Sequence, residues 1–133
     1  MGIVIDASAL IDAERGRLNL PAKIKGREQE EFFVSVITAS ELLHGVWRAK
    51  DPAVRSRRSA FVEGVLDQFP LLLIDLTIAR IHSQLWADSE SKGIPLGPHD
   101  RWIAASCIAY GHTLATGNVE EFKKVPGLTI DKW

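Results

Sequence analysis

The chain has 133 residues, the size of one domain, so we expect a single domain over residues 1–133. Hydrophobic residues make up 46% and charged residues 25% of the chain, and no apolar run reaches the roughly 18 residues of a membrane span, so a membrane protein is not expected. The net charge of -1 indicates no particular partner, and the single cysteine, Cys107, excludes an internal disulfide and favours the cytoplasm.

The first half of the chain alternates between buried strands and helices. Ile3, Val4 and Ile5 form an apolar run typical of a strand covered on both faces. Asp51 and Pro52 are typical of a helix start, as the capping residue and the first helical position. The pattern predicts, in chain order, a strand, two helices, a strand and two helices, over residues 3–6, 8–14, 21–31, 32–36, 38–48 and 51–68.

The second half of the chain continues the alternation. The two glycines and two prolines of "GIPLGP" predict a loop, and Gly111 ends the nearly all-apolar helix that follows it. The predicted elements are a strand, two helices and two short strands, over residues 71–75, 77–92, 99–110, 112–116 and 128–130. This order predicts an α/β fold with a central parallel sheet flanked by helices.

Three carboxylates fall where strands end or helices begin. Asp6 follows the first strand, Glu41 lies in the first turn of the helix after "FFVSV", and Asp100 begins the helix after "GIPLGP". The carboxyl ends of parallel strands meet at one edge of a sheet, so the three side chains are expected to share one site. Clustered carboxylates repel one another unless a cation neutralises them, and oxygen ligands alone favour Mg²⁺, with Mn²⁺ as a substitute.

Each of these residues also has a purely structural interpretation. Asp6 and Asp100 are residue types that cap helices, and Glu41 with Thr38 has the spacing of a capping box. Caps usually lie near the surface, whereas these three carboxylates adjoin apolar runs. Taken together, the three positions favour a shared site over three separate caps.

Four segments resemble one known family. They read "IVIDASALI", "VSVITASELLHG", "GIPLGPHDRWIAASCIAYGHTLATGNVEEF" and "VPGLTIDKW", and in this order they resemble the PIN-domain ribonucleases, most closely the VapC toxins of VapBC toxin-antitoxin modules. The resemblance runs from Ile3 to Trp133 and implies one PIN domain, a three-layer sandwich. It further implies a toxic, Mg²⁺-dependent endoribonuclease that forms a homodimer, is inhibited by a VapB-type antitoxin and meets DNA only through that antitoxin.

The resemblance also assigns residue roles. Asp6, Glu41 and Asp100 match the acidic, metal-holding positions of the family. Where many relatives carry a fourth acid, this chain has Asn118, with Glu121 three residues later, and either residue is a candidate for that position.

Other side chains are expected to support this site. Ser8 and Thr116 are candidate hydrogen-bond donors to the carboxylates, although both are also ordinary cap or turn residues. A basic cluster on and between the two central helices is a candidate for gripping RNA phosphates, and it consists of Arg48, Lys50, Arg55, Arg57 and Arg58. A solvated helical hairpin explains the same charges without RNA.

Two rival functions remain open from the sequence. A non-catalytic RNA-binding PIN-like domain would explain Asn118 at an acidic position. A phosphoacceptor signalling domain shares the α/β layout, and Asp75 after "LLLID" would then be the acceptor.

Overall fold

The computed structural model describes residues 2–133 and contains one five-stranded sheet in which every paired strand is parallel. The spatial order of the strands is β3-β2-β1-β4-β5. Their bounds are Gly2–Ile5 for β1, Glu31–Ser35 for β2, Leu71–Leu72 for β3, Thr113–Thr116 for β4 and Thr129–Lys132 for β5. β1 is the central strand, so the side chain that follows it lies in the middle of the sheet's carboxyl edge.

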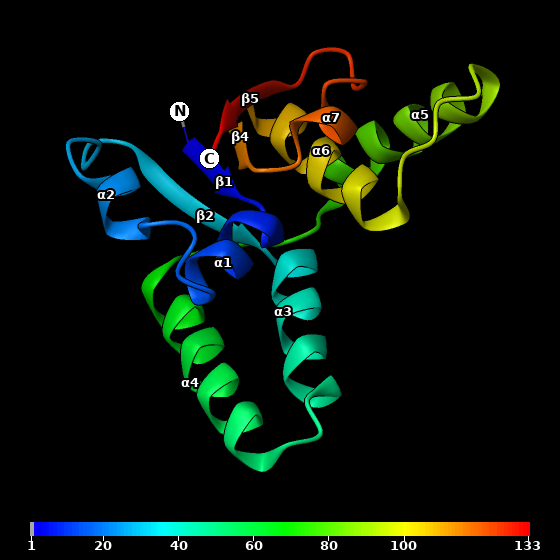
Figure 1. The fold of residues 1–133 in the computed structure, drawn as a ribbon. Helices are drawn as coiled ribbons and strands as arrows, with labels where there is room; N and C mark the ends of the chain where they lie inside the picture. The colour runs from blue at the N-terminus through cyan, green and yellow to red at the C-terminus, as the bar shows by residue number, and fades with distance from the viewer. Residues whose placement is uncertain (1) are drawn as a thin grey trace.

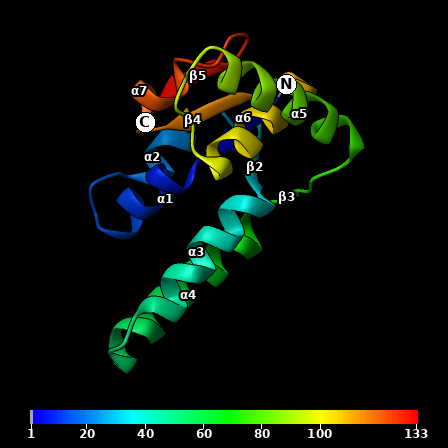
Figure 2. The same cartoon turned by 90° about the vertical axis from the view of Figure 1, so that its right-hand side faces the viewer.

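Helices cover both faces of the sheet, which confirms the predicted three-layer α/β architecture (Figure 1). Their bounds are Ala7–Glu14 for α1, Leu20–Ile24 for α2, Val36–Arg48 for α3, Pro52–Gln68 for α4, Leu76–Ser91 for α5, Pro98–Tyr110 for α6 and Val119–Phe122 for α7. α3 and α4 pack together as a long hairpin that extends away from the sheet, as the two views in Figures 1 and 2 show. α5 and α6 pack against each other at the other side of the molecule.

The alternation of side chains along β1 divides the core into two clusters. Ile3 and Ile5 point into the cluster formed with α1, α3 and α4, whereas Val4 points into the cluster formed with α6 and α7. All three residues are at most 3% exposed. Burial on both faces explains why this strand is apolar at every position.

Several predicted boundaries are wrong. The helix predicted over residues 21–31 ends at Ile24, because the next residue, Lys25, has an extended ψ of 130° and Gly26 takes a left-handed φ of +82°. The strand predicted over residues 71–75 is only Leu71–Leu72, and the last strand runs from Thr129 to Lys132. α7 was not predicted.

The part of the chain that the structure describes contains no helix long and apolar enough to cross a membrane. Cys107 is a buried free thiol in α6, as its apolar surroundings predicted. Burial, with a smaller contribution from the charge of Asp6, raises the pKa of this thiol to about 12. Cys107 is therefore a core residue and not a nucleophile.

Candidate active site

Asp6 occupies the capping position of α1 without capping it. Its carboxylate accepts no hydrogen bond from the N–H groups of the helix. Instead, Asp6 Oδ2 accepts hydrogen bonds from Ser8 Oγ at 2.9 Å and from Thr116 Oγ1 at 2.8 Å. Asp6 is only 5% exposed, and the interpretation of this residue as a helix cap is wrong.

A small hydroxyl network holds Asp6 in place. Ser8 Oγ and Thr116 Oγ1 lie 3.1 Å apart, so the two donors also contact each other. The backbone N–H of Gly117 donates to Ser8 Oγ at 3.2 Å, and that of Asn118 donates to Thr116 Oγ1 at 2.9 Å. The turn after β4 thus orients both hydroxyls towards the carboxylate.

Glu41 lies inside α3 and does not form the alternative capping box. Ser35 caps this helix by accepting a hydrogen bond from Ile37 N at 3.1 Å, and Thr38 Oγ1 is buried without a partner. Among residues 2–133, Glu41 Oε1 is also buried without a hydrogen-bond partner, while Oε2 lies 3.9 Å from His99 Nδ1. A buried carboxylate oxygen without a donor is costly, so this atom is available to a ligand.

Asp100 lies in the first turn of α6. This helix begins after Gly97, which has no side chain with which to cap it. Burial raises the pKa of Asp100, and the charges of Asp6 and Glu121 raise it further, against an opposing effect of His99. Burial likewise raises the pKa of Glu41; His99 opposes this shift, and Asp6 and Asp100 add to it. The predicted carboxylates therefore lie near enough to one another to repel.

Glu121 and Asn118 are both candidates for the fourth acidic position, and they differ in their contacts. Glu121 lies on α7 and acts electrostatically on Asp100, whereas the side chain of Asn118 makes no capping hydrogen bond. Glu121 Oε2 lies 3.8 Å from Lys124 Nζ. The extra negative charge at this end of the sheet thus comes from Glu121, since the asparagine at position 118 is uncharged.

Sequence reasoning missed two residues at this end of the sheet. Asp12 approaches the turn after β4, since a Cβ built on Gly117 would lie 3.8 Å from Asp12 Oδ2 and 3.8 Å from Ser8 Oγ. The signal was present, because Asp12 stands four residues after Ser8 and so shares its helix face. His99 precedes Asp100, and its contact with Glu41 depends on the packing of α3 against α6.

The donor set fits a hard cation such as Mg²⁺. The acidic groups all offer oxygen, and Glu41 Oε1 has no other partner among residues 2–133. A cation would offset the burial, and the smaller repulsion between carboxylates, that raise the pKa of Glu41 and Asp100. Among residues 2–133, no three acidic, histidine or cysteine side chains are drawn together tightly enough to form a ready-made metal site. Ligation would therefore use the three carboxylates together with water.

A groove of about 690 Å³ adjoins Glu41 and runs between α1, α3 and α4. Its polar lining combines cationic, imidazole and acidic side chains, namely Arg15, Arg48, Arg58, His44, His99, Glu14 and Glu41. The groove thus brings three arginines near the carboxylate of Glu41, and a cationic lining of this kind suits a polyanion.

The five residues of the predicted basic cluster lie in different environments in the structure. Arg48 and Arg58 line the groove, and Arg58 also donates to Gly45 O at 3.0 Å and lies 3.5 Å from Glu14 Oε1. Arg55 closes the end of α3 by donating to Ala49 O at 2.9 Å and to Trp47 O at 3.3 Å. The remaining two, Lys50 and Arg57, are exposed outside the groove.

The phosphoacceptor interpretation of Asp75 is wrong. Asp75 caps α5, because its Oδ1 accepts from Ile78 N at 2.9 Å, and its Oδ2 accepts from the hydroxyl of Tyr110. Both oxygens are occupied, and the residue lies beyond the two-residue strand β3 at one edge of the sheet. Asp75 is a structural residue.

Comparison with known proteins gives a consistent result. The PIN domain family matches residues 3–128. Ribonuclease VapC of Rickettsia bellii is 31% identical over 130 residues, which cover 98% of this chain and 95% of that protein. The tRNA(fMet)-specific endonuclease VapC of Salmonella typhimurium is 34% identical over 119 residues, covering 86% of this chain and 87% of that protein.

Solved structures agree with the sequence comparison. The chain matches a protein in the DNA-bound VapBC crystal structure from Salmonella typhimurium with a TM-score of 0.89 and 27% identity, covering 100% of this chain and 98% of that one. A chain of VapBC2 from Rickettsia felis, bound to a promoter DNA fragment, matches with a TM-score of 0.90, 22% identity and coverage of 100% and 99%. At 22% identity, the match to the Rickettsia felis structure supports the fold alone.

Proposed function

This chain belongs to the PIN-domain family, among the VapC ribonucleases, and from this premise we propose that it is the toxin of a toxin-antitoxin module, a Mg²⁺-dependent endoribonuclease. The proposal is supported by the electrostatic effect of Asp6 on both Glu41 and Asp100, and by a buried Glu41 oxygen that has no partner among residues 2–133. The charge of Glu121, which adds to the rise in the pKa of Asp100, favours catalysis over the rival, a non-catalytic RNA-binding domain.

Asp6, Glu41 and Asp100 would hold the cation, for which Mn²⁺ is a chemically suitable substitute. When bound, Mg²⁺ supplies Lewis-acid stabilisation of charge on the scissile phosphate and increases the acidity of water. Ser8 and Thr116 hold Asp6 in its orientation, since both hydroxyls donate to the same carboxylate oxygen. Glu41 can accept a proton or orient water through its free oxygen.

RNA would lie along the groove beside Glu41. Arg48 and Arg58 are placed to contact its phosphates, and Arg15 extends the cationic lining along α1. Arg57 and Lys50 can add longer-range attraction from outside the groove, whereas Arg55 is occupied at the end of α3. A single-stranded or looped RNA segment fits this open geometry better than a rigid duplex.

The partners follow from the same assignment. The structures named above are VapBC complexes, and we infer a VapB-type antitoxin that blocks the groove and provides any contact with DNA. A homodimer is supported by exposed apolar side chains around β3 and α5, which are Leu71, Leu73, Leu76 and Trp86. Because the substrate would be cellular RNA, we infer that the protein acts in the cytoplasm.

The proposal is tested by producing the chain in bacteria with and without the antitoxin encoded beside it. The wild-type chain alone should arrest growth, the antitoxin should restore it, and an Asp100→Asn chain should be harmless at the same abundance. Unimpaired growth while folded wild-type protein accumulates would overturn the toxin assignment. RNA cleavage by the purified protein, abolished by a chelator, tests the enzyme assignment separately.

A further inference from the structure

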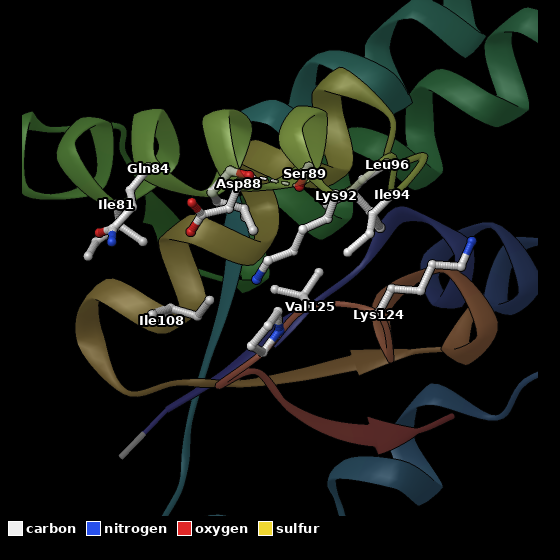
Figure 3. A pocket seen from close by; sticks show the side chains of 12 residues that line it. Ile81, Gln84, Asp88, Ser89, Lys92, Ile94, Leu96, Ile108, Lys124 and Val125 are labelled. Atoms are coloured by element: carbon white, nitrogen blue, oxygen red, sulfur yellow. Dashed lines mark hydrogen bonds between the residues drawn. The ribbon is translucent and has the colours of Figure 1, made fainter.

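A second hollow lies on the far side of the sheet from the groove and is formed by α5, α6 and the segment after α7 (Figure 3). We call it the α5–α6 pocket. Its volume is about 180 Å³, small enough for a single compact molecule. Its apolar walls include Leu85 on α5, Ile108 on α6 and Ile94, Leu96 and Val125 on the connecting segments.

The floor of the pocket belongs to the core of the protein. Leu96 and Val125 are 6% and 5% exposed and belong to the cluster beneath α6, and Leu85 and Ile108 pack against that cluster. A floor made of core residues keeps its shape without a ligand. Covering these apolar walls with an apolar molecule would be favourable in proportion to the area removed from water.

The ammonium group of Lys92 lies at the mouth of the pocket and has no ion-pair partner among residues 2–133. Figure 3 shows the side chain of Lys92 reaching across the opening towards Val125. Ser89 Oγ is occupied, since it donates to Leu85 O at 2.7 Å, and Lys124 Nζ lies 3.8 Å from Glu121 Oε2 and points away from the hollow. Asp88 also lines the rim but forms no ion pair with Lys92 among residues 2–133.

We propose that the α5–α6 pocket binds a small amphiphilic carboxylate, with its apolar body against Leu96 and Val125 and its carboxylate on Lys92. The volume limits the body to a medium-length acyl chain or one aromatic ring. A single ammonium suits a monoanion, and the lining contains no arginine fork of the kind that recognises phosphate. Asp6, Glu41 and Asp100 do not line the pocket, and the proposal does not depend on the ribonuclease assignment.

The proposal is tested with the full-length protein and two matched probes, octanoate and the uncharged 1-octanol. Methyl resonances of Leu85, Ile94, Ile108 and Val125 are followed by NMR while each probe is titrated. Octanoate should give saturable shifts confined to these methyls. Lys92→Gln should weaken octanoate binding by about tenfold, as expected for loss of a charged hydrogen bond, and leave 1-octanol binding unchanged.

Two further variants sharpen the result. Ile94→Trp fills the hollow and should abolish the shifts with both probes, whereas Lys123→Gln removes a lysine that pairs with Glu120 outside the pocket and should change nothing. Absent or unsaturable shifts would overturn the proposal, as would equal weakening of both probes by Lys92→Gln. Concentration-dependent shifts without any probe would show that a second copy of the chain occupies the pocket. If Ile94→Trp fails to fold, the comparison of octanoate with 1-octanol binding to Lys92→Gln still tests the proposal.

Discussion

The hydroxyl of Thr116 donates a hydrogen bond to Asp6 Oδ2 at 2.8 Å, although the two residues stand 110 positions apart in the chain. This contact results from the parallel pairing of β1 with β4. Ile5 pairs with Ala115, so the residues that follow them, Asp6 and Thr116, lie side by side at the carboxyl edge of the sheet. The carboxylate that follows a fully buried strand is therefore stabilised by donors, and its charge acts on Glu41 and Asp100. This contact explains how an acid can end the central strand of the sheet.

The first prediction concerns this contact. Thr116→Val removes the hydroxyl and leaves Asp6 Oδ2 with only Ser8 as a side-chain donor, so Mg²⁺ affinity should fall by about 10- to 100-fold. Cleavage rates measured across a series of Mg²⁺ concentrations provide the affinity. Thr113→Val at the other end of β4 is the matched control, and equal effects of the two substitutions would contradict a specific role for Thr116.

The second prediction separates the two candidates for the fourth acidic position. Glu121→Gln should reduce cleavage at limiting Mg²⁺ far more than Asn118→Ala, because Glu121 is the residue that acts on Asp100. Glu120→Gln is the control, since Glu120 pairs with Lys123 on the exposed side of α7. A larger loss from Asn118→Ala than from Glu121→Gln would assign the position to the asparagine.

The third prediction separates two arginines of the basic cluster. Arg55→Ala should lower the free energy of unfolding by about 1–2 kcal/mol, because two backbone carbonyls at the end of α3 lose their donor. Arg57→Ala should leave stability nearly unchanged, since its side chain is exposed. Urea denaturation measures both variants, and equal stabilities would show that the Arg55 contacts contribute nothing.

The groove arginine Arg48 gives a fourth prediction. If it contacts an RNA phosphate, Arg48→Ala should reduce the slope of log binding constant against log salt by about 0.7 for single-stranded RNA. The loss should be similar for RNAs of different sequence, because a phosphate contact reads no base. An unchanged slope would remove Arg48 from the RNA interface.

The fifth prediction follows from the raised pKa values of Glu41 and Asp100, whose ordinary values are 4.5 and 3.8. A carboxyl whose pKa is higher in the folded state binds more protons when folded, so its unfavourable contribution grows as pH rises through that window. In a chelator, Asp100→Asn should be more stable than wild type at pH 7, and this advantage should shrink as pH falls towards 4. Urea denaturation across this pH range would contradict the account if the difference stayed constant.

The candidate site could largely be predicted because its carboxylates stand at points that the sequence marks. Apolar runs identify where buried strands end, and in a parallel sheet those ends meet at one edge, so Asp6, Glu41 and Asp100 follow from local pattern and topology. Whether these carboxylates cap helices instead could be decided only from the positions of their side chains. Only the structure could show that Ser35 caps α3 and that Asp6 faces Thr116.

Other features depend on contacts between distant residues. The chain leaves helical geometry after Ile24, and the following segment is held by the ion pair of Arg27 with Asp131, 104 positions away. The basic cluster was identified by charge, but charge does not reveal that Arg55 binds carbonyls of the preceding helix. The sequence offers both Glu121 and Asn118 for the fourth acidic position, and only the structure reveals that the charge of Glu121 acts on Asp100.

The most direct test of the account is the joint dependence of cleavage and stability on Mg²⁺, measured on wild type, Asp6→Asn and Asp100→Asn. The two substitutions keep side-chain size and remove one charge each, so cleavage of an RNA pool should fall by about a hundredfold or more. Mg²⁺ should raise the melting temperature of the wild type and shift that of either variant much less, because a ligand stabilises only the state that binds it. If both variants cut RNA at the wild-type rate and Mg²⁺ leaves all three melting temperatures unchanged, the carboxylates do not form a metal-dependent active site.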